Sequence, residues 1–71
     1  MTRITAARVI AGVGNARLSL HNGGGYWYFV YDDGGDVYET RSVMVQRLGD
    51  MSLDAWIAEG RALCQIAESR A

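Results

Sequence analysis

The sequence contains no proline and no lysine, and it has a single cysteine, Cys64, and a single histidine, His21. One cysteine excludes an internal disulfide framework and is typical of a reducing compartment. One cysteine and one histidine also fall short of the four ligands that a zinc site of the usual type needs. We therefore expect no metal ion and no cofactor.

Long apolar runs and excess charge are also missing. No run approaches the ~20 residues of a membrane-spanning helix, and the first residues lack the apolar core of a signal peptide, so we expect a cytoplasmic protein without a membrane partner.

The formal net charge is −1, from seven arginines and eight acidic residues. Nucleic-acid-binding proteins usually carry a basic excess, because contacts to phosphates dominate their affinity. This balance argues against nucleic acid as the partner.

With 71 residues, the chain has room for a single domain over residues 1–71. A domain of this size buries only roughly 60% of the surface of its unfolded chain. Large aromatic side chains, regular secondary structure and self-association are the remaining sources of stability.

The N-terminal segment predicts a short helix over residues 3–11, with Thr2 as its N-cap and Gly12 or Gly14 at its end. A strand over the same residues is the alternative. The helical face that we expect to be buried consists of Ile4, Ala7 and Ala11.

The middle of the chain predicts a three-stranded antiparallel sheet. An alternating strand over 16–22 leads through a glycine turn to an aromatic strand over 26–31, and a β-branched strand follows over 37–46. In the first strand, Ala16, Leu18 and Leu20 alternate with Arg17, Ser19 and His21.

The hairpin between the second and third strands decides which residues share a face. A two-residue turn at Asp-Gly or Gly-Gly places Glu39 and Arg41 on the same face as Tyr26, Tyr28 and Val30. A loop of three or five residues, or a bulge, would exchange the faces. Because charged residues are poorly suited to burial under a helix, we expect this face to point outward. The opposite face, expected to pack on a helix, carries Trp27, Phe29 and Tyr31.

The C-terminal segment predicts a long amphipathic helix, capped by Ser52 and stapled by Met51 and Trp56. Gly60 lies in the middle of its apolar stripe and costs about 1 kcal/mol relative to alanine; we expect it to permit close approach to Trp27 or Trp56. The apolar stripe consists of Leu53, Trp56, Ile57, Gly60, Leu63, Cys64 and Ala67. Together the elements predict an α+β fold in the order α-β-β-β-α.

The outward face of the sheet is the main candidate site. Tyrosine and arginine are enriched at protein interfaces, so we expect this face to bind another protein. Two alternatives remain open: its side chains merely cover the sheet, or the N-terminal helix buries them. The candidate contact residues are Tyr26, Tyr28, Glu39 and Arg41, with Arg17 and His21.

Three further features of the sequence are weaker candidate sites. The acidic hairpin tip at Asp32, Asp33 and Asp36 lacks the spacing of a calcium loop. We interpret it as a solvated tip. A weaker candidate role is that its carboxylates mimic the phosphates of a nucleic acid and bind an arginine-rich partner. A nucleophile–base pair would need His21 beside a serine or Cys64, and we expect no enzymatic activity. A ridge of small residues on the C-terminal helix could support a homodimer: Ala55, Ala58, Ala62 and Ile66.

Residues 25–60 contain "GYWYF", then "SVMVQRL", then "MSLDAW". This succession resembles small uncharacterised proteins encoded by bacteriophages and prophages. The resemblance implies a phage or mobile-element accessory protein acting in the host bacterial cell, for which a stoichiometric inhibitor of a defence system, as in anti-CRISPR proteins, is the expected role. The alternatives are a self-associating assembly module and a small nucleotide or nucleic-acid binding module at "HNGGG". The matching residues are Gly25 to Phe29, Ser42, Val43, Val45, Arg47, Leu48, Ser52, Leu53, Asp54 and Trp56.

Overall fold

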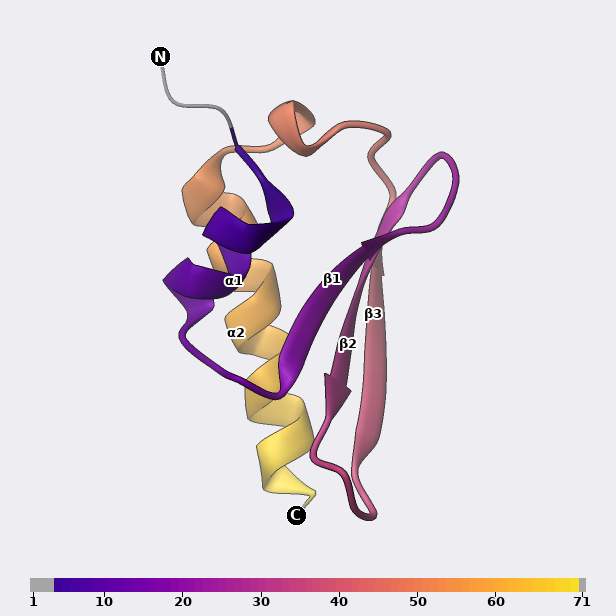
Figure 1. The fold of residues 1–71 in the computed structure, drawn as a ribbon, viewed down its shortest axis with the longest axis vertical. Helices are drawn as coiled ribbons and strands as arrows, with labels where there is room; N and C mark the ends of the chain where they lie inside the picture. Colours follow the sequence, from indigo (N-terminus) through magenta and orange to yellow (C-terminus); the bar gives the residue numbers. More distant parts are fainter. Residues whose placement is uncertain (1–3, 71) are drawn as a thin grey trace.

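The computed structural model describes residues 4–70 and has a three-stranded antiparallel sheet with both helices on one side of it (Figure 1). The predicted α+β class and the order α-β-β-β-α are confirmed. Strand β2 lies between β1 and β3. The elements are α1 (Ala6–Val13), β1 (Leu18–Asn22), β2 (Trp27–Asp32), β3 (Tyr38–Val43), the 3-10 turn η1 (Leu48–Asp50) and α2 (Leu53–Ser69).

Helix α1 is held at both ends by local hydrogen bonds. The Thr5 hydroxyl accepts from the Arg8 amide at 3.2 Å and caps the helix. The helix ends at Gly14, one of the two predicted ends, where φ is +73° and the amide donates to Ile10. The predicted helix in this segment is therefore confirmed, and the alternative strand is wrong. The N-cap is Thr5; the predicted cap, Thr2, lies outside the described residues.

The buried face of α1 differs from the predicted one. Ala7 and Ala11 are exposed, whereas Val9 is fully buried and Ile10 and Val13 are half-buried. The larger β-branched side chains remove more apolar surface from water than alanine does, so they determine which face turns inward. Helix α1 contacts α2 and β1 on the helix side of the sheet. The alternative in which it buries the outward face is wrong.

Helix α2 follows the prediction closely. The Ser52 hydroxyl accepts from the Ala55 amide at 3.1 Å and caps the helix. At the centre of the interface, the Phe29 and Trp56 rings are both fully buried and meet edge to face at 6.0 Å. The predicted stripe is confirmed: Trp56, Gly60, Leu63, Cys64 and Ala67 are buried, and Leu53 and Ile57 are half-buried.

Gly60 lies where α1, α2 and the sheet come closest together. A Cβ atom on Gly60 would lie 2.8 Å from Val13 Cγ2, 3.1 Å from Leu18 Cδ2 and 3.2 Å from Phe29 Cε1. The predicted close approach is confirmed, but its neighbours are these three residues, not the two tryptophans.

The hairpin between β2 and β3 has a five-residue loop. Asp32 pairs with Tyr38 at the end of the ladder, and residues 33–37 form the loop, in which the Asp33 amide donates to the Val37 carbonyl at 3.3 Å. The Asp33 carboxylate accepts from the amides of Gly35 (2.7 Å) and Val37 (3.3 Å), and this local bonding stabilises the longer loop.

This loop exchanges the faces of β3. Phe29 stands opposite Arg41, and Tyr31 stands opposite Glu39; directly opposed residues share a face. The prediction that Glu39 and Arg41 point outward is therefore wrong, because it assumed a two-residue turn. The prediction that Trp27, Phe29 and Tyr31 face the helix is confirmed.

Both indole rings bind the connector between β3 and α2. Trp56 Nε1 donates to the Leu48 carbonyl at 2.7 Å, and Trp27 Nε1 donates to the Gln46 carbonyl at 3.2 Å.

Within residues 4–70, neither helix is both long and apolar enough to cross a membrane.

Candidate functional site

The face of the sheet opposite the helices carries aromatic and small polar side chains. The register places His21, Tyr28 and Ser42 in one cross-strand row, and Ser19, Val30 and Thr40 in the next. In Figure 1 both helices lie on the other side of the sheet. We call this surface the outer face; its residues are Ser19, His21, Tyr26, Tyr28, Val30, Asp32, Tyr38, Thr40 and Ser42.

Three rings gather at the glycine-loop end of the outer face. His21 stacks on Tyr28 with ring centroids 5.3 Å apart and 26° between the planes. Tyr26 lies 6.0 Å from Tyr28, and its ring packs so closely on Gly23 that a side chain there would meet it. Beside the rings lies an open depression of about 370 Å³. Its lining residues are Gly23, Tyr26, Tyr28, Thr40 and Ser42.

The glycine loop before β2 is shaped by its own backbone. The Gly23 amide donates to the Tyr26 carbonyl at 2.8 Å, and the Gly24 amide donates to the Asn22 side chain at 2.8 Å. Gly24 and Gly25 have φ of +82° and +107°, which L-residues rarely adopt. These glycines serve the turn. Because the amides of Gly23 and Gly24 are already bonded, the loop is poorly suited to cradle a phosphate.

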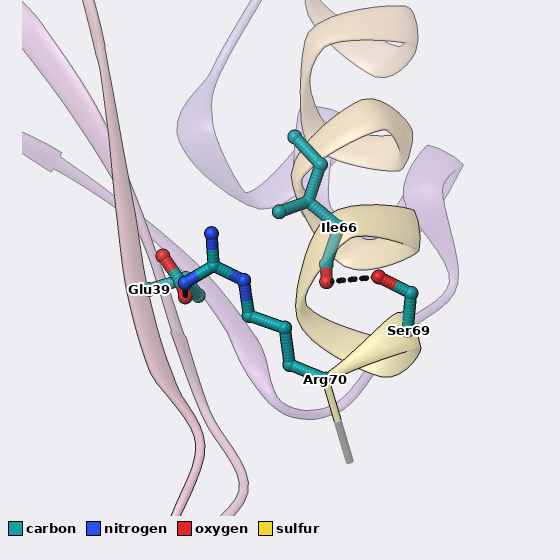
Figure 2. Close-up of polar contacts among 4 residues, drawn as sticks. All are labelled: Glu39, Ile66, Ser69 and Arg70. Carbon is teal, nitrogen blue, oxygen red and sulfur yellow. Dashed lines mark hydrogen bonds and ion pairs between the residues drawn. The ribbon is translucent and has the colours of Figure 1, made fainter.

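Two of the predicted contact residues lie on the helix side instead. Arg41 forms an ion pair with Glu59 of α2, and Glu39 forms one with Arg70 at the end of α2 (Figure 2). Both pairs connect β3 to the flank of α2. They tie the helix to the sheet and take no part in the outer face.

Arg17 also lies away from the ring cluster. The hydroxyl-bearing side chain of Tyr31 raises the pKa of Arg17 above its ordinary value, and the Asp33 and Glu68 carboxylates add to this. The Arg17 backbone carbonyl accepts from the Asp32 amide at 3.1 Å, at the end of β1 opposite His21. Of the six predicted contact residues, the structure brings together Tyr26, Tyr28 and His21.

Ser19 and His21 meet as a nucleophile–base pair would require, with 2.8 Å between Oγ and Nε2. However, the Ser19 hydroxyl also lies 3.5 Å from the Val30 carbonyl, to which only the hydroxyl can donate. Which of Oγ and Nε2 donates in their own contact depends on the imidazole tautomer. A catalytic base needs the arrangement in which the nitrogen accepts from the hydroxyl.

The acidic hairpin tip binds its own backbone. The Asp32 carboxylate accepts from the Gly34 amide at 2.9 Å, as Asp33 does from Gly35. Asp36 is exposed. Within residues 4–70, no three His, Cys, Asp or Glu side chains lie close enough together to hold a metal ion. The tip has the geometry of a loop that stabilises itself.

The prediction from sequence missed Thr40, Ser42 and Gly23 as parts of the depression. The missing signal was the length of the hairpin loop, which moves Thr40 and Ser42 to the outer face. Asp-Asp-Gly-Gly-Asp contains that signal, because aspartate side chains bond amides two residues ahead and so favour turns of their own.

Comparisons with protein-family models, with curated proteins and with solved structures gave no match to this chain.

Proposed function

We propose that this protein is a non-enzymatic protein-binding module, and that its outer face is the contact surface. The observation that carries the proposal is the cluster of Tyr26, Tyr28 and His21 beside an open depression on a face that no helix covers. Tyrosine supplies large contact area at a low cost in conformational entropy. A ring that is half-buried before binding loses little further freedom when a partner covers it.

The chemistry of the outer face favours protein over nucleic acid. None of the residues that define it is an arginine or a lysine, and Asp32 adds a negative charge. Phosphate contacts from arginine and lysine supply much of the affinity for nucleic acids, and the residues that define this face include neither. Serine, threonine and tyrosine hydroxyls suit the polar groups of a protein surface.

We further propose that the partner belongs to a bacterial defence complex and that binding inhibits it stoichiometrically in the host cytoplasm. This finer step is supported by the resemblance of residues 25–60 to phage and prophage proteins. The small size of the domain is consistent with an inhibitor that acts by occupying a surface.

A photo-crosslinking experiment tests the contact surface. A photoreactive residue at position 42 would line the depression, whereas one at position 65 would lie on the exposed side of α2. We expect a discrete crosslinked host protein from position 42 only. The identified partner is then purified and titrated by calorimetry, with a fixed stoichiometry expected. Crosslinking from position 65 but not from position 42 would contradict the proposal.

A double variant tests the ring cluster with the same purified partner. Tyr26→Ala with Tyr28→Ala should weaken binding by at least ~30-fold, because interface tyrosines in well-packed pockets often contribute ~2 kcal/mol or more. Tyr38→Ala is the matched control: it removes the same side chain from the far end of the face, where Tyr38 is 62% exposed. Equal affinities of the double variant and the control would refute the assignment.

A further inference from the structure

The free edge of β3 offers unpaired backbone groups. Among the described residues, 4–70, β3 pairs only with β2. The Asp33 amide donates to the Val37 carbonyl, so Val37 points its backbone groups at β2. In an antiparallel ladder the direction of the backbone N–H and C=O groups alternates from one residue to the next. The backbone groups of Glu39 and Arg41 therefore point at β2 as well. The backbone groups of Tyr38, Thr40 and Ser42 therefore point away from the sheet.

Little protects this edge from pairing with another strand. Natural edges are usually blunted by proline, lysine, a bulge, a covering element or inward-pointing charges. β3 has inward-pointing charges in Glu39 and Arg41, but each forms an ion pair with α2 or its end. The chain has no proline or lysine, and the β2–β3 register runs without a bulge from Trp27–Val43 to Asp32–Tyr38. Large apolar side chains are exposed at both ends of the strand, with Tyr38 62% and Met44 78% accessible.

We propose that β3 pairs antiparallel with β3 of a second copy of this chain, with the twofold axis at Thr40. Thr40 then faces Thr40 of the second copy, and Tyr38 faces Ser42 of that copy. All three residues direct their backbone groups toward the new partner, so each can donate and accept across the interface. The two sheets become one continuous antiparallel sheet.

Charge favours this register over those centred on Glu39 or Arg41. With the axis at Thr40, Glu39 of each copy stands opposite Arg41 of the other. An axis at Arg41 would place two guanidinium groups face to face, and an axis at Glu39 would oppose two carboxylates; like charges in direct opposition are destabilising. An axis between residues would join the outer face of one copy to the helix side of the other.

The flank of α2 above β3 fits the same arrangement. Glu59 and Arg70 reach from this flank to β3, and Figure 2 shows Ile66 projecting from the same flank as Arg70. Ile66 is 41% exposed, and Ala62, one turn away, is half-buried. The twofold axis brings the two α2 helices together antiparallel along this flank, and small residues permit close approach. The predicted ridge thus contributes Ala62 and Ile66 to the dimer.

The dimer joins the two outer faces into one surface without covering either ring cluster. This inference does not depend on the proposed function, since its test needs no partner protein.

Charge-reversal variants test the interface. Sedimentation velocity over a concentration series should show a monomer–dimer equilibrium for the wild type. Glu39→Arg and Arg41→Glu should each weaken self-association at least ~tenfold, because each places like charges opposite one another. An equimolar mixture of the two variants should restore dimers, since every pair across the axis is again of opposite sign. Arg61→Glu, on the flank of α2 that faces α1, is the matched control and should dimerise as the wild type does.

Rescue by mixing separates the interface from folding defects, because an unfolded variant cannot be restored by another. Amide hydrogen exchange gives a second readout. Protection of Tyr38, Thr40 and Ser42 should rise with protein concentration, whereas Arg41 should be protected throughout by its bonds to β2. A wild type that stays monomeric at every concentration, variants that dimerise like the wild type, or mixtures that stay monomeric would each overturn the proposal. Concentration-dependent protection at β1 instead of β3 would overturn it too.

Discussion

Replacing Gly60 by alanine adds one methyl group, which has two opposing effects on the free energy of unfolding. In an exposed helix this change stabilises by about 1 kcal/mol through helix propensity. Here the new Cβ would lie 2.8 Å from Val13 Cγ2, and within 3.2 Å of Leu18 and Phe29. Overpacking of a tight core costs about 1–3 kcal/mol. We therefore expect Gly60→Ala to lower the free energy of unfolding by a net amount of about 1 kcal/mol.

Urea denaturation followed by tryptophan fluorescence measures this loss, and thermal unfolding followed by circular dichroism gives a second value. For a domain of this size, 1 kcal/mol corresponds to a fall in Tm of about 4–8 °C. Ala58→Gly is the matched control on the exposed side of the same helix, and it should lose about 1 kcal/mol through propensity alone.

A double-mutant cycle with Val13→Ala identifies the cause. Val13→Ala removes the methyl group that the new Cβ would meet first. In that background Gly60→Ala should be less destabilising than in the wild type, or even stabilising, because contacting residues couple. If Gly60→Ala raised the stability of the wild type, or had the same effect in both backgrounds, close packing would not be the reason for glycine at this position.

Two further predictions concern buried polar chemistry. Trp56→Phe removes the Nε1 donor from the Leu48 carbonyl and should lower the free energy of unfolding by about 1–3 kcal/mol, measured by urea denaturation; an unchanged midpoint and slope would contradict this. Burial raises the pKa of the Cys64 thiol above its ordinary value of 9.0, with a smaller contribution from the Glu68 carboxylate. The unfolded chain then releases this proton at a lower pH than the folded one, so stability should decline as pH rises through about 9. The decline should be smaller in Cys64→Ala, and equal declines in both proteins would refute it.

The two helices differ in how well the sequence pattern predicted their buried faces. The stripe of α2 was predictable because large apolar residues recur on one face over several turns and Ser52 marks the start. In α1 the same reasoning gave the correct element but the wrong face. The helix has only 8 residues, too few for its periodicity to outweigh the choice between alanines and the bulkier Val9.

In the sheet, the length of one loop decides which side chains share a face. All three strands were predictable from alternation and β-branched residues, and so was the inward direction of Phe29. The placement of Arg41 depended on whether the β2–β3 loop had an even or odd number of residues. Two aspartate carboxylates settled that by bonding amides of the loop. The difference between a two-residue and a five-residue loop therefore changed which side chains form the candidate site.

The two indole hydrogen bonds have a consequence for internal motion. Trp27 belongs to the sheet and Trp56 to the helix, and they bind carbonyl groups of Gln46 and Leu48 in the same short connector. The connector is therefore a common attachment point for both layers. Partial opening of the molecule should begin at the opposite end, where the exposed ion pair between Arg70 and Glu39 joins the end of α2 to β3.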